Sequence, residues 1–208
     1  MHAAVRLRER VRAAKILVLK KGMLPQGAST KNAGFACFGS LSEIVEDLQN
    51  HTEEEVIALV QKRWSGLQLL RKRIPDAVLD YKPFGGYELF LEHEESLYAE
   101  CVNKMAFVNE ILNPIFKAGV FTKVVDRFGL KGTKEDLIFN PFEGHSHTGH
   151  MMQELLRQAV AANILILNQQ TVTGFEDKSS SVEVALGDFS FTTQKLLFAT
   201  NGFAAELT

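Results

Sequence analysis

The segment at residues 15–39, KILVLKKGMLPQGASTKNAGFACFG, constrains the fold of this chain more than any other. It opens with four aliphatic residues, 16–19, a run typical of a strand buried on both faces of a parallel sheet. Gly22, Pro25 and Gly27 then end the strand pattern and predict a loop. Because open α/β sheets bind ligands at the carboxyl ends of their strands, we expect the small residues of this loop to let backbone amides approach a ligand.

Composition and charge exclude several kinds of partner. The chain has 208 residues, 46% of them hydrophobic, and can bury the core of one or two domains. Its 23 basic and 25 acidic residues give a net charge of -2, so we expect no nucleic-acid partner. No apolar run reaches the roughly 20 residues of a membrane span, so we expect none. Two cysteines far apart in the sequence, without a signal-peptide pattern, favour a cytoplasmic protein.

The middle of the chain combines helices with short strands. Two capping boxes, Ser40 with Glu43 and Thr52 with Glu55, each predict the start of a helix. The remaining expected elements are a hairpin at 78–92, a helix from about 95 that Asn113-Pro114 kinks or divides and Gly119 ends, and strands at 120–125 and 137–139. Such a mixture between pieces of an α/β sheet predicts an inserted α+β domain.

The last third of the chain returns to the first pattern. A helix is expected after Thr148, and the aliphatic run at 164–167 then resembles the run at 16–19, which predicts the return half of a βαβ unit. Short alternating runs joined by polar turns follow and predict an antiparallel meander, with strands at 172–176, 182–186 and 189–192. A further strand is expected at 195–199, ending in the turn Ala-Thr-Asn-Gly at 199–202.

Two of these turns carry a resemblance to a known family. Residues 18–34, VLKKG-x(4)-GASTKNAG, resemble the second strand and following loop of the FAD-dependent oxidoreductases of the D-amino-acid oxidase and glycine oxidase type. That family typically reads VLE-x-G-x(4)-GAS-x-x-NAG there. The ATNG turn is similar to a later FAD-contacting turn of the same family. The acid that ends the family's strand, where it binds the adenosine ribose hydroxyls, is Lys20 here.

The resemblance implies an α/β fold: a partial Rossmann-like FAD-binding domain, with a parallel sheet and an antiparallel meander, carrying an inserted α+β substrate domain. It divides the chain into residues 1–40 and 145–208 for FAD binding and 41–144 for the substrate domain. The cofactor it implies is FAD. The positions matching the family's cofactor contacts are Lys21, Gly27, Ala28, Ser29, Thr30, Asn32, Ala33, Gly34, Val172, Ala199, Thr200, Asn201 and Gly202.

This chain matches the family pattern only from a point partway through that pattern. The first expected element is a helix at 3–14, and no G-x-G-x-x-G turn, whose amides hold a pyrophosphate, occurs in the sequence. The match also stops before the family's carboxyl-terminal part. We therefore expect an internal fragment that binds FAD weakly or not at all by itself and is inactive alone. The catalytic residues are unknown from this sequence.

The reaction implied by the resemblance is oxidation of a small-molecule amine or amino acid, with hydride transfer from a C–N bond to the flavin. The alternative is a non-catalytic remnant or binding module of the same fold. A zinc-dependent hydrolase is less favoured. His145, His147 and His150 form H-x-H-x-x-H, part of the metallo-β-lactamase motif, but Gly149 replaces that motif's Asp and no histidine follows. These residues fit a turn in which Thr148 caps the following helix.

Overall fold

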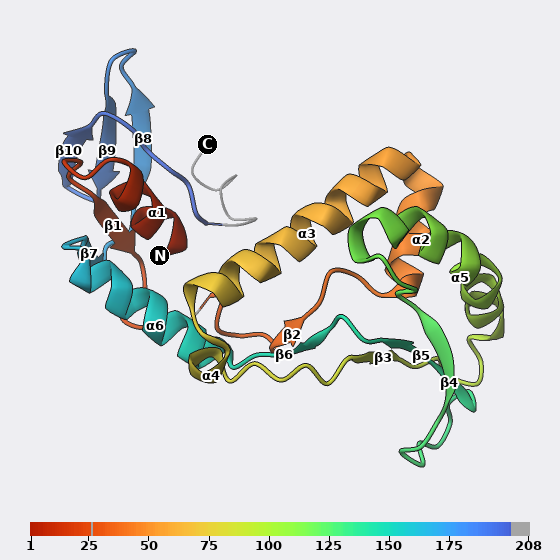
Figure 1. Ribbon diagram of the computed structural model, residues 1–208. Coiled ribbons are helices and arrows are strands. Elements are labelled where there is room, and N and C mark those ends of the chain that lie inside the picture. Colours follow the sequence, from red (N-terminus) through yellow and green to blue (C-terminus); the bar gives the residue numbers. More distant parts are fainter. Residues whose placement is uncertain (26, 201–208) are drawn as a thin grey trace. The chain divides into compact units, whose positions relative to one another are not determined.

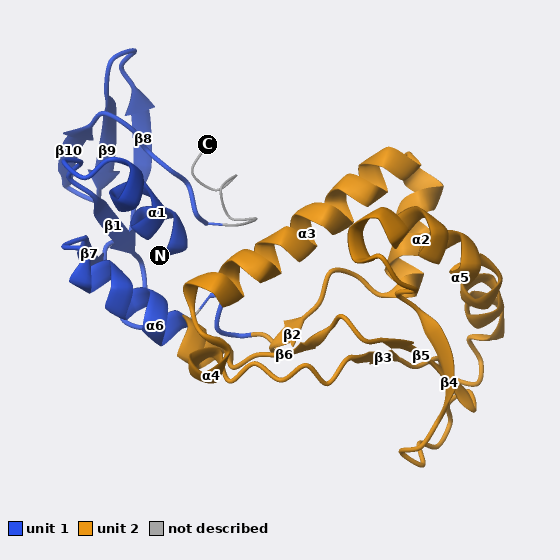
Figure 2. Cartoon of the chain, viewed as in Figure 1, with its two compact units in different colours: residues 1–31, 152–208 blue, residues 32–151 orange. Residues whose placement is uncertain are grey.

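The computed structural model describes residues 1–25 and 27–200, and Figure 1 shows its helices and strands. The chain forms two compact units, one of residues 1–31 and 152–208 and the other of residues 32–151 (Figure 2). The expected domain division at 40/41 and 144/145 remains a prediction. No helix in the described part of the chain is long and apolar enough to cross a membrane.

The first unit is built on a parallel strand pair. Its elements are α1 (His2–Arg10), β1 (Leu17–Lys20), most of α6 (Thr148–Ala161) and β7 (Leu165–Asn168). β1 pairs with β7 in parallel, from Leu17 opposite Leu165 to Lys20 opposite Asn168. Val5 of α1 and Ala159 of α6 are buried together with Ile164, which precedes β7, so the helices pack beside the strands. The two aliphatic runs therefore form the expected βαβ return, and the α/β class is confirmed.

A meander completes this unit. Its strands are β8 (Gly174–Asp177), β9 (Val182–Leu186) and β10 (Phe189–Thr193), antiparallel in the order β10-β9-β8. The predicted meander is confirmed, but the strand expected at 195–199 is wrong, because residues 195–200 have no strand. Instead of forming a strand, this apolar run packs one side chain on the meander: the Phe198 ring centroid lies 4.9 Å from the Phe175 ring centroid of β8. A short apolar run alone does not distinguish these two arrangements.

The second unit holds the remaining helices. They are α2 (Leu41–Asn50), α3 (Glu53–Arg73), α4 (Asp76–Leu79) and α5 (Glu95–Phe116). Both predicted capping boxes are present, since Ser40 and Thr52 each accept from the backbone three residues on and the glutamate there bonds back. α5 is not divided at Pro114. It ends at Phe116, and its C-cap is Lys117 in the left-handed region (φ 56°) rather than Gly119.

Two antiparallel sheets accompany these helices. β2 (Phe35–Ala36) pairs with β6 (Gly144–His145), and β3 (Gly86–Glu88), β5 (Asp136–Asn140) and β4 (Thr122–Val125) form a sheet in the order β3-β5-β4. The hairpin predicted at 78–92 is wrong. Pro75 begins the short helix α4, and β3 pairs with β5, about fifty residues away, because that pairing covers the helical core. Short-range alternation could not reveal a long-range partner.

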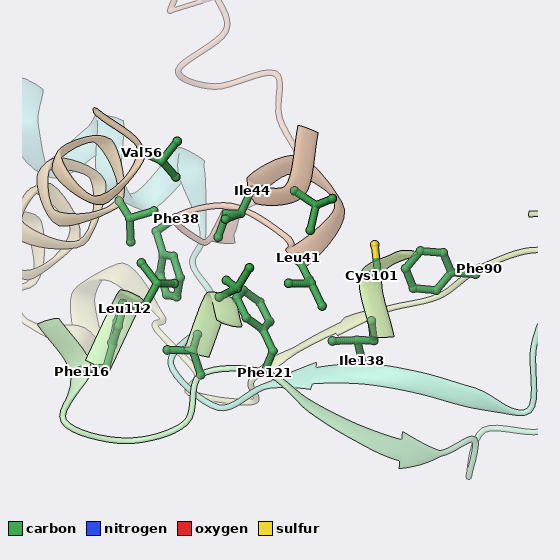
Figure 3. Packing of buried hydrophobic residues seen from close by; sticks show 14 residues of the cluster. Phe38, Leu41, Ile44, Val56, Phe90, Cys101, Leu112, Phe116, Phe121 and Ile138 are labelled. Carbon is green, nitrogen blue, oxygen red and sulfur yellow. The ribbon is translucent and has the colours of Figure 1, made fainter. Parts of the chain in front are cut away.

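Aromatic rings pack among aliphatic side chains in the core of the second unit (Figure 3). The Phe38 and Phe116 ring centroids lie 4.7 Å apart, and Trp64 lies 5.1 Å from Phe116. Each aromatic pair contributes about 0.5–1.5 kcal/mol beyond the area it buries. Leu41 and Ile44 of α2 and Leu112 of α5 are fully buried in the same cluster. This core holds the amino end of α2 against the β3-β5-β4 sheet.

Candidate functional site

The loop after β1 has a conformation fixed by its own hydrogen bonds. The backbone amides of Thr30 and Lys31 both donate to the Gly27 carbonyl, and Thr30 Oγ1 donates to the carbonyls of Pro25 and Gly27 at 3.1 and 3.0 Å. Gly27, Ala28 and Ser29 are exposed. A Cβ added at Gly27 would meet nothing within 4 Å. The loop is therefore held by its own hydrogen bonds and has open space beside its glycine.

The segment after β7 lies along the end of β1. The Gln170 amide donates to the Lys20 carbonyl at 3.0 Å, immediately beyond the last paired residues of the two strands. Val172 follows, half-buried, and the Thr173 amide donates to Ala185 in the meander. The first unit thus brings Lys21 and Val172 to the same carboxyl edge of the parallel pair. This is the edge at which α/β sheets bind nucleotides.

The other predicted contact residues divide between the units. Ala199 and Thr200 belong to the first unit and are exposed, following the Phe198 ring that packs on β8. Asn201 and Gly202 lie outside the described residues. Asn32, Ala33 and Gly34 belong to the second unit.

Position 34 requires glycine for a structural reason. Its amide donates to Asn32 Oδ1 at 3.0 Å, and its carbonyl accepts from the Ser146 amide at 2.8 Å. Its φ is +80°, and an added Cβ would lie 2.2 Å from the Ser146 carbonyl oxygen. The close approach beside β2 and β6 therefore requires glycine at position 34 whether or not a cofactor binds there.

Lys20 is the most unusual group at the carboxyl edge. Its Nζ is buried and has no hydrogen-bond partner among the described residues, and burial lowers the pKa of this ammonium group. A buried donor of this kind is costly until an oxygen acceptor satisfies it. Sugar hydroxyls and phosphates supply such oxygens, so Lys20 and the open space at Gly27 fit a nucleotide. Lys20 cannot, however, accept a hydrogen bond from ribose hydroxyls as a carboxylate would.

The histidines cap a helix. His147 Nδ1 accepts from the His150 amide at 3.1 Å, and the His147 carbonyl accepts from the Met151 amide. The imidazole of His147 is therefore one acceptor at the start of α6, and the cap predicted at Thr148 stays a prediction. The His147 and His150 rings stack with centroids 3.9 Å apart. In the described part of the chain no three His, Cys, Asp or Glu residues are grouped so as to hold a metal.

Sequence reasoning missed a polar cluster in the second unit. Glu88, Asn140 and Glu143 line one cavity there. They come from β3, β5 and the residues before β6, which are distant in sequence and meet only through strand pairing. No local motif marks them.

Comparison with known proteins identifies the fold. The family model described as FAD dependent oxidoreductase matches residues 1–208. Glycine oxidase from Geobacillus kaustophilus superposes with a TM-score of 0.66 at 16% identity, over 99% of this chain and 54% of that one. L-Amino acid deaminase from Proteus myxofaciens gives 0.65 at 14%, over 97% and 43%, and L-proline dehydrogenase from P. horikoshii gives 0.62 at 18%, over 98% and 50%.

Because these sequence identities are low, the structural similarity shows the fold alone. Comparison with curated protein sequences gives no match. This chain spans about half the length of the solved structures that it resembles.

Proposed function

The chain belongs to the DAO family of FAD-dependent oxidoreductases, and on this premise we propose that it forms the cofactor-facing part of an enzyme that oxidises a small amine or amino acid. The similar solved structures are named as a glycine oxidase, an L-amino acid deaminase and an L-proline dehydrogenase, which supports this substrate class. A cytoplasmic location belongs to the same proposal. The observation that carries it is the small-residue loop at the carboxyl edge of β1 and β7.

In this proposal, residues 1–40 and 145–208 bind FAD and residues 41–144 form the substrate domain. When bound, FAD supplies the acceptor for the hydride that leaves the carbon of a C–N bond. The exposed backbone at Gly27 and Ser29 approaches the cofactor, and Val172 offers backbone groups to it. We assign no catalytic side chain.

The test is FAD binding by the purified chain, measured by fluorescence titration. We expect a dissociation constant above about 1 µM, because Lys20 stands where a carboxylate would hold the ribose. Gly27→Leu fills open space without disturbing the fold and should weaken binding at least tenfold. Gly66→Leu is the matched control, an exposed glycine of α3 with nothing within 4 Å of an added Cβ, and should leave binding unchanged. Equal binding by both variants would refute the proposed site.

A further inference from the structure

The second unit contains a cavity of about 680 Å³ whose walls are mainly apolar. The rings of Tyr87, Phe121 and Phe128 line it, and the polar groups of Glu88, Asn140 and Glu143 enter it. The Tyr87 and Phe128 rings meet edge to face at 5.1 Å. An apolar pocket with a few convergent polar groups is the usual form of a small-molecule site.

The carboxylate of Glu88 is already engaged by the protein. It accepts from the Leu41 amide at 3.0 Å and from the amide and hydroxyl of Ser42. These donors are the first groups of α2, where a carboxylate also complements the helix dipole. Glu88 therefore has few lone pairs left for a ligand.

Glu143 is the available carboxylate. It lies over the bare backbone of Gly86, where an added Cβ would fall 1.9 Å from Glu143 Oε2. Burial raises the pKa of Glu143 to about 7, and the negative charges of Glu88 and Glu43 add to this shift. The Asn140 amide and a backbone hydrogen bond from Phe38 oppose it. A carboxylate held this way gains most from a cation placed beside it.

Asn140 is the second polar group of the cavity. The residue is only 3% exposed, and its Oδ1 is engaged, accepting from the Phe142 amide at 3.0 Å. Its amide group lies close enough to Glu143 to lower the pKa of that carboxyl, but among the described residues Nδ2 makes no hydrogen bond of ordinary geometry. The cavity therefore offers an acceptor and a donor side by side, and a buried donor without a well-aligned acceptor gains from a ligand oxygen.

We propose that this cavity binds an organic ammonium ion that carries a neutral oxygen beside its nitrogen, such as an amino alcohol or amino amide. The ammonium donates to Glu143, Asn140 Nδ2 donates to the ligand oxygen, and the apolar body lies against Tyr87 and Phe128. A free amino acid fits poorly, because its carboxylate would face the carboxylates of Glu88 and Glu143. The site lies wholly within residues 32–151 and does not depend on flavin binding.

Binding should be coupled to release of a proton. Because the pKa of Glu143 is raised to about 7, part of the population carries a proton at pH 7, and a bound cation drives the group to its charged form, releasing a fraction of a proton per ligand. The neighbouring Cys37 thiol does not contribute at this pH, since burial and the charge of Glu143 raise its pKa, although Arg63 of α3 opposes that shift. The released proton therefore identifies Glu143.

The experiment is calorimetric titration of the 208-residue chain at pH 7 with phenylalaninol and with phenylalanine, each in two buffers of different ionisation enthalpy. We expect phenylalaninol to bind at least tenfold more tightly than phenylalanine and to release a measurable fraction of a proton. Glu143→Gln should abolish binding. Glu46→Gln, an exposed change on α2 outside this cavity, should preserve it.

A second variant keeps the proposal testable if Glu143→Gln fails to fold. Gly86→Ala changes no charge and puts a methyl group where the Glu143 carboxylate lies, so it should lower the affinity at least tenfold. Equal affinity for the two ligands, binding retained in Glu143→Gln, or no binding by a chain that unfolds cooperatively would each overturn the proposal.

Discussion

Asn109 should be among the residues that most stabilise the second unit. From α5 its Oδ1 accepts from the amides of Val120 and Phe121 at 2.9 and 2.8 Å, and its Nδ2 donates to the Phe121 carbonyl at 2.9 Å. Val120 and Phe121 are 0% and 2% exposed, so water cannot replace these bonds. Asn109→Ala leaves three buried backbone groups unpaired.

Each unpaired group costs about 1–3 kcal/mol, and partial relaxation brings the sum to about 3–5 kcal/mol. Asn103→Ala is the matched control, because Asn103 is exposed on the same helix and its replacement should change stability by at most about 0.5 kcal/mol. Asn109→Asp keeps the acceptor oxygen and should cost less than Asn109→Ala.

Urea unfolding followed by Trp64 fluorescence measures this difference. Trp64 is the sole tryptophan and packs against Phe38 and Phe116, so its signal follows the same unit. With a urea dependence of about 2 kcal/mol per M, the unfolding midpoint should fall by about 2 M in Asn109→Ala. A midpoint no lower than that of Asn103→Ala would refute the reasoning.

Three further predictions concern strain, pH and charge. Gly34→Ala should destabilise the second unit by about 2 kcal/mol or more in the same urea assay, since it combines a positive φ with a clash at the Ser146 carbonyl. The raised pKa of Glu143 means that the folded state binds the proton more tightly, so the contribution of Glu143 to stability should fall by about 3 kcal/mol as the pH rises from 4.5 to 7, measured as the difference between the unchanged protein and Glu143→Gln. Lys20→Glu restores an acceptor for ribose hydroxyls and should tighten FAD binding about tenfold by fluorescence titration. Lys15→Glu, the same charge change at the exposed opposite end of this strand segment, should leave FAD binding unaltered.

Local signals in the sequence predicted the elements that depend on neighbouring residues. The two aliphatic runs predicted the parallel pair of β1 and β7, and the Ser40 and Thr52 boxes predicted the starts of α2 and α3. Turn residues predicted the meander. In each case the stabilising partner lies within a few residues or repeats a recognisable pattern.

The errors arose where a distant partner decides the outcome. Alternation at 78–92 suggested a hairpin, but β3 pairs with β5, about fifty residues away. The cluster of Glu88, Asn140 and Glu143 had no sequence signal at all, because strand pairing brings its members together. Long-range contacts of this kind cannot be inferred from one sequence.

Hydrogen–deuterium exchange of the chain with and without millimolar FAD tests the central claim most directly. If the cofactor binds at the carboxyl edge of β1 and β7, FAD should slow exchange in peptides covering residues 21–31 and 169–173, and leave β3, β4 and β5 unchanged. Protection confined to the β3-β5-β4 sheet, or no protection anywhere, would contradict the account.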